Sequence, residues 1–155
     1  YRTSYVLCRV MRKWRQGIFT PTHQDKFIGS TATYRSGLEL KFFRFCDNNP
    51  NVLEWGSENV FVPYKSPVDN RMHRYFVDNF IVIREGEQIK KYLVEIKPFK
   101  QTQLPTTKYK KRRHLLYEQK MYITNQAKWE AAKEYGKKKG YVFIILTEKE
   151  LNNTK

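Results

Sequence analysis

The sequence predicts an α/β fold in which a mixed β-sheet is flanked by helices. Segments whose apolar residues recur at helical spacing alternate with short runs of β-branched and aromatic residues. Their order is helix, strand, strand, strand, helix, strand, and no internal repeat is found. The chain has 155 residues, 40% of them hydrophobic, which is enough for one domain with a sizeable core.

Two segments carry an apolar stripe at helical spacing. The first, residues 34–49, is expected to end at the Asn-Asn-Pro sequence that begins with Asn48. The second, residues 125–139, is expected to end at Gly140, which fits a helix C-cap. The stripes consist of Leu38, Phe42, Phe45 and Cys46 in the first helix and of Ala127, Ala131, Ala132 and Tyr135 in the second.

The β-branched and aromatic runs predict four strands, at residues 58–64, 73–83, 90–97 and 141–147. Glu85 and Gly86 form a turn signal between the second and the third strand, so residues 73–97 are expected to form a hairpin. Residues 97–114 are polar, basic and interrupted by two prolines, which predicts a mobile loop. Residues 1–33 are expected to be irregular, and a plausible translation start at Met11 leaves open whether residues 1–10 are native.

The charge of the chain indicates a polyanionic partner. Thirty Lys and Arg residues oppose fifteen Asp and Glu residues, for a net charge of +15. Such an excess attracts nucleic acid through its phosphates, although high solubility or adhesion to an anionic membrane would also use it. No segment combines the charge with a strong amphipathic apolar face, and no apolar run approaches the roughly 20 residues of a membrane-spanning helix. The composition therefore favours a nucleic-acid partner and no membrane partner.

The cysteine and histidine content argues against a zinc site. Cys8 and Cys46 are the only cysteines, no CxxC motif is present, and the three histidines lie far apart in the sequence. We expect a soluble intracellular protein in which both thiols are free.

Three charged residues in the predicted hairpin indicate a catalytic site. Asp78 interrupts an otherwise apolar strand, and Asp is rarely buried without a partner. Glu95 and Lys97 lie two residues apart on the next strand and therefore point to the same face. If the strands pair, Asp78 and Glu95 converge beside Lys97. Two carboxylates at one point suit Mg²⁺, which prefers oxygen ligands and bridges to phosphate, and a nearby Lys can orient the attacking water.

Asp78 followed by Glu95-Ile96-Lys97 resembles the PD-(D/E)XK motif of the restriction-endonuclease-like nucleases. The αβββαβ core of that superfamily agrees with the predicted order of elements. One departure is Val77, which occupies the position of the Pro in the motif's name, a position that varies. The resemblance implies metal-dependent cleavage of DNA with Mg²⁺ or Mn²⁺ held by Asp78, Glu95 and the backbone carbonyl of Ile96.

Longer blocks resemble the head completion nucleases of large tailed bacteriophages, which are related to the endonuclease subunit of certain cut-and-paste transposons. These blocks span about residues 30–150 and include RYFVDNF, LVEIKPFKQTQ and KWEAAKEYGKKKGYVFIILTE. The resemblance implies that Glu39 completes the acidic cluster. It also implies a nuclease domain over residues 34–150, an N-terminal extension over residues 1–33 and a tail over residues 151–155.

The same resemblance implies a virion protein of the head or neck that is also found in the host cytoplasm. It would contact head or neck proteins and act on packaged DNA ends. Two alternatives stay open: a structural DNA-binding component of the head, and a transposase-like endonuclease that needs a partner. The sequence distinguishes neither end cutting from internal cutting nor single-strand from double-strand cutting.

Each candidate residue also has a simpler interpretation. Taken singly, Asp78 fits a structural residue at a strand end, and Glu95 with Lys97 fits an exposed pair. Glu39 fits a capping box with Ser36, in which its carboxylate bonds to the backbone at the helix start. The basic residues fit either a solvated surface or contacts to the DNA backbone. The predicted DNA-binding residues are Arg74, Lys100, Lys108, Lys110, Lys111, Arg112, Arg113 and Lys128.

Overall fold

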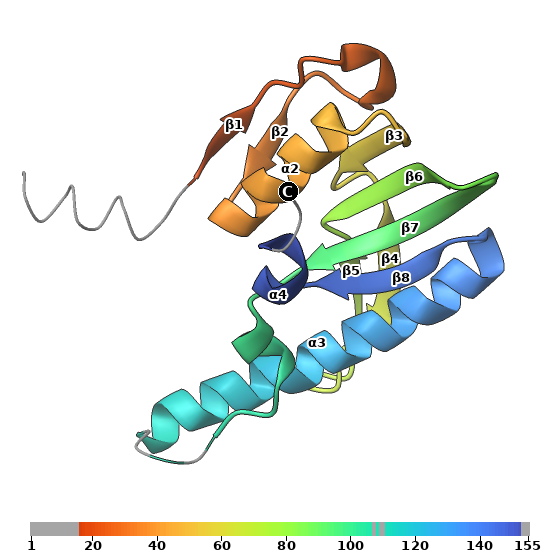
Figure 1. Ribbon diagram of the computed structural model, residues 1–155. Helices are drawn as coiled ribbons and strands as arrows, with labels where there is room; N and C mark the ends of the chain where they lie inside the picture. The colour runs from red at the N-terminus through yellow and green to blue at the C-terminus, as the bar shows by residue number, and fades with distance from the viewer. Residues whose placement is uncertain (1–15, 107, 109–110, 153–155) are drawn as a thin grey trace, which may run out of the picture.

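A four-stranded mixed sheet forms the centre of the protein (Figure 1). The structure is a computed structural model that describes residues 16–106, 108 and 111–152. The three strands that lie side by side from one edge are antiparallel, and the fourth is parallel to its neighbour. In spatial order the strands are β3 (Val52–Ser57), β6 (Asn79–Glu85), β7 (Gln88–Ile96) and β8 (Val142–Leu146). The predicted mixed α/β architecture is therefore confirmed.

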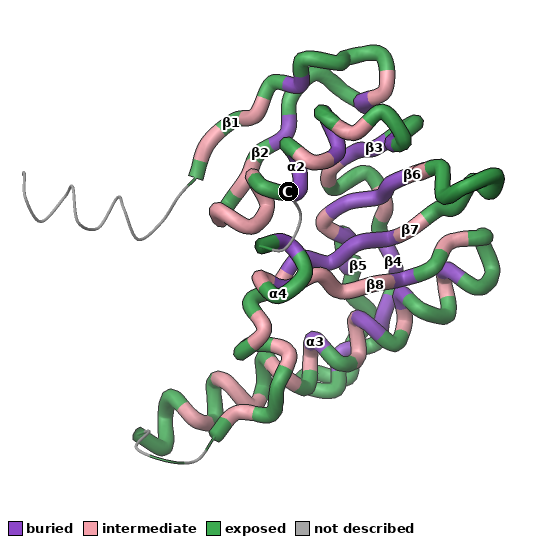
Figure 2. The backbone as a smooth tube through the Cα atoms, in the orientation of Figure 1, coloured by how far each residue is buried: buried purple, intermediate pink, exposed green. Residues whose placement is uncertain are grey.

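Apolar side chains on both faces of the sheet are covered. Because successive residues of a strand point to opposite faces, Val94 and Ile96 of β7 join the core beneath helix α2 (Gly37–Asn48), whereas Leu93 joins a second core beneath helix α3 (Arg112–Lys139). Figure 2 shows the buried residues concentrated along the central strands and on the adjacent part of α3. The two helices therefore make β7 a fully buried strand at its end, where Glu95 lies.

Helix α2 confirms the first predicted helix, although it begins at Gly37, three residues later than expected. The second helix was predicted too short, because α3 begins at Arg112 instead of residue 125. The added N-terminal turns carry exposed apolar residues on several sides, so no single stripe marks them in the sequence. They extend beyond the sheet in Figure 1. Gly140 has a φ of 82° and caps the helix as predicted.

The strand predictions need three corrections. The first strand of the main sheet is β3, which was not predicted. A register shift between Val52 and Glu54 disturbs the alternation of inward and outward side chains by which a strand is recognised. The predicted strand at residues 58–64 corresponds to β4 (Phe61–Lys65), which lies in a separate two-stranded sheet. The predicted strand at residues 73–83 is in fact two strands, β5 (Met72–Phe76) and β6. The chain leaves one sheet and enters the other at Val77 and Asp78.

The N-terminal segment is more ordered than expected. Two short antiparallel strands, β1 (Gly17–Phe19) and β2 (Ala32–Tyr34), enclose a 3₁₀ turn, η1 (Gln24–Lys26). Phe27 packs in the same core as Trp55, with ring centroids 4.6 Å apart. Residues 1–10, whose origin was left open, lie outside the described residues.

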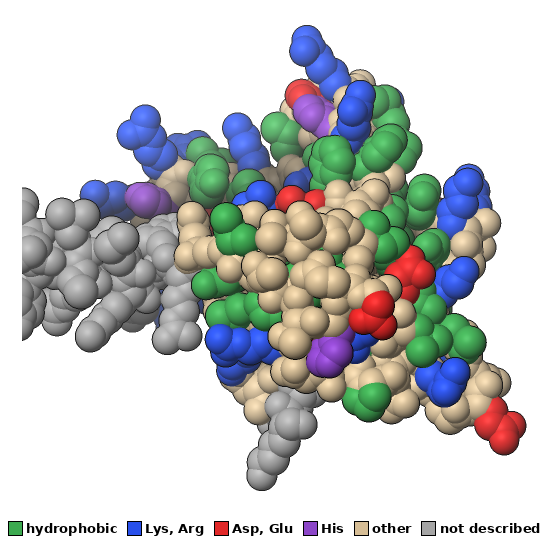
Figure 3. Space-filling view, turned by 90° about the horizontal axis from the view of Figure 1, so that it is seen from above, with side chains coloured by type: hydrophobic (Ala, Val, Ile, Leu, Met, Phe, Trp, Pro, Cys, Tyr) green, Lys and Arg blue, Asp and Glu red, His purple; other side chains and the backbone are tan. Residues whose placement is uncertain are grey.

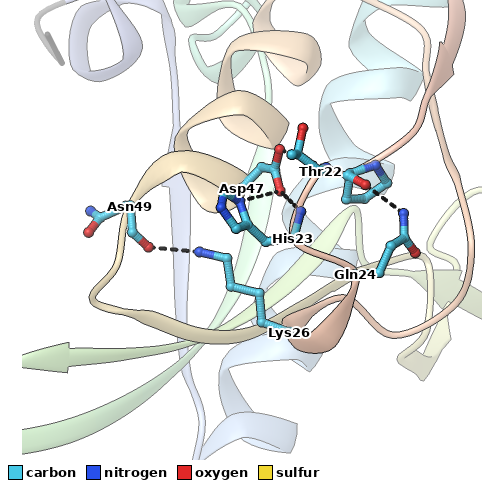
Figure 4. Close-up of polar contacts among 7 residues, drawn as sticks. Thr22, His23, Gln24, Lys26, Asp47 and Asn49 are labelled. Atoms are coloured by element: carbon cyan, nitrogen blue, oxygen red, sulfur yellow. Dashed lines mark hydrogen bonds and ion pairs between the residues drawn. The ribbon is translucent and has the colours of Figure 1, made fainter.

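The buried carboxylate of Asp47 anchors this segment to helix α2 (Figure 4). It accepts hydrogen bonds from the backbone N–H groups of Thr22, at 3.0 Å, and His23, at 2.9 Å. The amine of Lys26 donates to the carbonyl of Asn49 beyond the helix end, at 2.8 Å. Burial favours the neutral form of Asp47, but these donors outweigh it and hold its pKa below the ordinary value.

The remaining short elements follow β7 and its parallel neighbour β8, the strand at the edge of the sheet. A 3₁₀ turn, η2 (Phe99–Thr102), comes after β7, within the segment predicted as a loop. A one-turn helix, α4 (Glu148–Leu151), comes after β8 and is closed by a capping box between Thr147 and Glu150. Cys46 is a buried free cysteine, and Cys8 lies outside the described residues. Along the described part of the chain, no helix combines the length and the apolar character needed to cross a membrane.

Candidate active site

The β6–β7 hairpin brings Asp78 and Glu95 together as the sequence predicted. Asn79 pairs with Val94 across the two strands, and the next position on each strand is Asp78 on one side and Glu95 on the other. The backbone N–H of Ile96 donates a hydrogen bond to Oδ2 of Asp78 over 2.8 Å. The Asp78 carboxylate is therefore held at the end of the hairpin by the residue that follows Glu95.

Glu95 is buried, with only 4% of its surface exposed. The phenol of Tyr75 donates a hydrogen bond to its Oε2. The Nζ of Lys97 lies 3.8 Å from its Oε1. Glu95 and Lys97 alternate with the core residues Val94 and Ile96, so both are directed to the α3 side of the sheet. Two partners from different strands thus fix the second carboxylate.

Helix α3 adds a second cation to this group. Lys128 is half-buried, and its Nζ lies 5.6 Å from the ring centroid of Tyr75 and 5.8 Å from that of Tyr64. Burial lowers the pKa of Lys128, and the carboxylates of Glu95 and Asp78 oppose that shift. Lys128 therefore faces the candidate site, whereas the sequence favoured a solvated helical lysine.

Burial disfavours the charged form of both carboxylates, and Glu95 adds to this effect at Asp78. Burial, then the negative charge of Glu95, raises the pKa of Asp78 to about 8, while the N–H of Ile96 acts in the opposite direction. Burial also raises the pKa of Glu95, against the effects of Tyr75, Lys97, Lys128 and a hydrogen bond to Asp78. The half-buried carboxylate of Asp78 and the buried carboxylate of Glu95, both with raised pKa values, lie where a bound cation would stabilise both charges.

Glu39 caps the start of helix α2, which was the alternative to a role at the metal. Its Oε2 accepts a hydrogen bond from the backbone N–H of Arg35 at 2.6 Å, and its own N–H donates to Oγ of Ser36 at 3.2 Å. Its charge nevertheless contributes to the raised pKa of Asp78. Glu58, directly after β3, pairs with the Arg35 guanidinium at 2.6 Å. Glu39 thus caps α2 while it lies within electrostatic reach of Asp78.

The donor set fits a hard divalent cation. Asp78 and Glu95 present oxygen ligands, which Mg²⁺ and Mn²⁺ prefer, and no sulfur or imidazole donor accompanies them among the described residues. Within residues 16–106, 108 and 111–152, no group of three or more His, Cys, Asp and Glu side chains is placed to hold a metal ion. A cation bound by two carboxylates would complete its shell with backbone oxygen, water or phosphate, as Mg²⁺ commonly does.

Comparison with known proteins identifies the family. Residues 49–148, which contain Asp78, Glu95, Lys97 and Lys128, match the family described as TnsA-like endonuclease N terminal. The chain belongs to this family. It is also 36% identical over 140 residues to the head completion nuclease of Enterobacteria phage T4, a match that covers 85% of this chain and 90% of the relative. The predicted resemblance to head completion nucleases and to the transposon endonuclease subunit is confirmed, and so is the assignment as a nuclease.

Apart from Lys128, the predicted basic residues of this TnsA-like endonuclease lie at three places. Arg74 is exposed on β5, with its guanidinium 5.6 Å from the ring centroid of Phe61. Lys100 is exposed in η2 and borders a cavity of about 610 Å³ between residues 99–106 and α3. Lys108 is exposed, Lys110 lies outside the described residues, and the run continues at the start of α3 with Lys111, Arg112 and Arg113.

The basic run is therefore remote from the carboxylates. Sixteen residues separate Arg112 from Lys128 along α3, which corresponds to roughly 24 Å at 1.5 Å per residue. The prediction that the loop extends to residue 114 is wrong, because Arg112 and Arg113 are already helical. Figure 3 shows Lys and Arg side chains at several separate places on one face of this endonuclease, with few Asp and Glu side chains between them.

Two neighbours of the site were not predicted. Tyr75 lies three residues before Asp78 in the same predicted strand. Nothing in the sequence distinguished it from the other aromatic residues of that strand. Arg35 lies next to the predicted capping box, and no pattern distinguished it from the other basic residues of this endonuclease. Both contacts join distant parts of the chain, since Tyr75 and Glu95 are 20 residues apart in the sequence and Arg35 and Glu58 are 23 residues apart.

Proposed function

We propose that this protein hydrolyses phosphodiester bonds of DNA with Mg²⁺ or Mn²⁺ bound between Asp78 and Glu95. The observation that carries the proposal is the convergence of the half-buried Asp78 carboxylate and the buried Glu95 carboxylate beside Lys97 and Lys128, in a chain with a net charge of +15. In a structural ion pair, the charge of a carboxylate is usually neutralised by cationic groups of the protein. Here the raised pKa values indicate that the carboxylates lack sufficient positive charge from the protein.

Each residue has a defined task in this reaction. Asp78, Glu95 and the backbone carbonyl of Ile96 would hold the cation, and Glu39 would complete the cluster or bind a second ion. A cation bound there would polarise the phosphoryl oxygen and lower the pKa of a bound water. The ammonium group of Lys97, 3.8 Å from Glu95, would orient the attacking water. Lys128 would stabilise negative charge on the phosphate from the α3 side of Glu95.

The basic side chains would hold the DNA backbone with little sequence preference, because contacts to phosphate carry no base information. The 24 Å or so between Lys128 and Arg112 corresponds to about seven nucleotides of a duplex strand at 3.4 Å each. Arg74 and Lys100 would contact phosphates close to the carboxylates. Lys108, Lys110, Lys111, Arg112 and Arg113 would contact phosphates farther along the strand.

The order of the core elements supports a restriction-endonuclease-like fold for this domain. Helix α2, strands β3, β6 and β7, helix α3 and strand β8 follow one another as αβββαβ when the β4–β5 sheet is treated as an insertion. The phage relative, a head completion nuclease, supports a role at the virion head. The proposal extends this role to the neck and the host cytoplasm, with packaged DNA ends as the substrate and head or neck proteins as partners.

The test is cleavage of supercoiled and linear DNA with Mg²⁺, Mn²⁺ or EDTA. We expect the wild type to cut only with metal, and Asp78→Ala and Lys97→Ala to reduce cutting by at least about two orders of magnitude. Lys133→Ala, an exposed change on α3, is the matched control. Comparison of the two substrates distinguishes internal cutting from end cutting.

Two results would contradict the catalytic assignment. If the variants cut as fast as the wild type, the site lies elsewhere. If the wild type binds DNA but never cuts it, a partner-dependent endonuclease or a structural DNA-binding role replaces the proposal. A Lys97→Ala protein that still completes phage heads would favour the structural role.

A further inference from the structure

One face of the β4–β5 hairpin carries exposed aromatic and basic side chains. Phe61 is 47% exposed and Phe76 is 50% exposed, and they are cross-strand partners with ring centroids 5.9 Å apart. Pro63 pairs with Arg74 and Lys65 with Met72 in the same register. Because side chains two residues apart share a face, these residues form one surface. We name it the aromatic platform; it consists of Phe61, Pro63, Lys65, Met72, Arg74 and Phe76.

The opposite face of the hairpin is buried and supports the platform. Val62, Tyr64 and Tyr75 pack with Trp129 and other residues of α3 in the second core. Isolated two-stranded hairpins are only marginally stable in water. This hairpin is held against α3, so the platform is presented by a supported part of the fold.

The platform is connected directly to the candidate active site. The backbone N–H of Val77 donates to the carbonyl of Val60 at 3.0 Å, and that of Glu58 donates to the carbonyl of Asp78 at 3.0 Å. The hairpin pairing thus continues from Phe61 and Phe76 up to Asp78. Phe76 is two residues from Asp78, a rise of roughly 7 Å along an extended chain. The platform therefore begins roughly 7 Å along the chain from Asp78.

The chemistry of the platform matches unpaired nucleotides. Exposed aromatic rings stack on the faces of bases, and neighbouring cations contact the phosphates between them. The Arg74 guanidinium lies 5.6 Å from the centroid of Phe61, and the only charged residues of the platform, Lys65 and Arg74, are both basic. An apolar face could also bind a second copy of this chain, but two proteins of charge +15 repel each other, whereas DNA is attracted.

We propose that the aromatic platform stacks unpaired bases of the DNA strand next to the phosphate that is cut. This inference rests on the nuclease function proposed above and specifies its substrate: DNA with an open or single-stranded stretch at the cleavage point. In a closed duplex the base faces are stacked on one another, so Phe61 and Phe76 have no access to them.

The test measures binding by the full-length protein in EDTA, so that cleavage does not interfere. The probes are a single-stranded oligonucleotide, a duplex with an unpaired end and a fully paired duplex, each carrying the fluorescent base 2-aminopurine. The key variant is Phe61→Ala with Phe76→Ala, and Phe61→Leu with Phe76→Leu keeps apolar surface without a ring. Ile89→Ala, at an exposed position on β7, is the control.

We expect the double alanine variant to bind both unpaired probes more weakly than the wild type. The loss of affinity should be about fivefold or more for each base that no longer stacks. Quenching of 2-aminopurine should disappear as well. The leucine variant should behave like the alanine variant, and affinity for the paired duplex should stay unchanged. Circular dichroism checks that the variants fold, which is expected because both side chains are half exposed.

Three outcomes would overturn the platform: unchanged binding by the double variant, an equal loss for all three probes, or a wild-type dimer that the double variant dissociates. Cleavage by the wild type is scored in the separate assay described above. The absence of cutting therefore contradicts the nuclease function, whereas unchanged binding by the double variant contradicts the platform alone.

Discussion

The phenol of Tyr75 donates a hydrogen bond to the buried carboxylate of Glu95, although the two residues belong to different sheets. Tyr75 lies on β5 beside β4, and Glu95 lies on β7 in the central sheet. The hydrogen bond therefore joins the hairpin that carries the aromatic platform to the strand that carries Glu95 and leads to Lys97. It fixes the orientation of a carboxylate that would bind the cation.

Removal of this hydrogen bond should weaken metal binding. Tyr75→Phe keeps the buried ring but leaves Oε2 of Glu95 without its donor. Removal of such an orienting partner costs about 10- to 100-fold in metal affinity or activity. We expect the Mg²⁺ concentration for half-maximal cleavage to rise by about that factor. Tyr117→Phe, at an exposed position on α3, is the control. An unchanged Mg²⁺ requirement would show that Tyr75 has no role in metal binding.

Two substitutions at Glu39 separate its capping role from a role at the metal. Glu39→Gln keeps an oxygen that can accept from the N–H of Arg35, whereas Glu39→Ala removes it. We expect both variants to lose cleavage and only the alanine variant to lose stability, by about 1 kcal/mol in urea unfolding. If Glu39→Gln cuts at the wild-type rate, Glu39 serves the helix alone.

Lys128 should contribute to catalysis through its charge. Lys128→Met keeps most of the aliphatic contact with Tyr64 and Tyr75 but removes the cation that faces Glu95. We expect kcat to fall about tenfold or more. Lys133→Met, on the exposed side of the same helix, should leave kcat unchanged. A normal kcat with weaker DNA binding would make Lys128 a DNA contact only.

Asp47 should stabilise the protein in a pH-dependent way. Asp47→Ala removes the acceptor for the backbone N–H groups of Thr22 and His23, shown in Figure 4, at a cost of about 1–3 kcal/mol of unfolding free energy. Because folding lowers the pKa of Asp47, its contribution is complete above the ordinary value of 3.8 and is lost as the pH falls through the lowered pKa.

Chemical unfolding at pH 7 and pH 3 checks this prediction. The difference between the wild type and Asp47→Ala should shrink at the lower pH. Asp25→Asn, an exposed change in η1, should show no such difference. An Asp47→Ala variant that is as stable as the wild type at pH 7 would show that the anchor contributes nothing measurable.

The basic start of α3 should act through phosphates without sequence preference. Replacement of Lys111, Arg112 and Arg113 by Gln should weaken binding to all DNA sequences by a similar factor. The slope of log K against log salt should fall by about 1 for each phosphate that the variant no longer neutralises. Titrations at several salt concentrations measure both quantities. An unchanged slope would place the DNA path away from this end of the helix.

Local patterns were sufficient for the part of the site that lies within one hairpin. Asp78 and Glu95 converge because β6 and β7 are joined by the tight turn at Gly86, which has a φ of 63° and fixes the register. The same patterns failed where a strand changes sheet. Nothing within residues 73–83 shows that the chain leaves β4 and joins β3 at Asp78, because both halves are rich in strand-forming residues.

The sequence by itself determined the α/β class, the Glu95-Ile96-Lys97 motif and its pairing with Asp78. These depend on residue type and on the two-residue period of strands, which are local properties. Only the tertiary structure decided that Tyr75 and Lys128 border Glu95, and that Phe61 and Phe76 form an exposed surface beside Asp78. Those arrangements result from the packing of α3 against the β4–β5 sheet, which joins distant parts of the chain and leaves no periodic trace in the sequence.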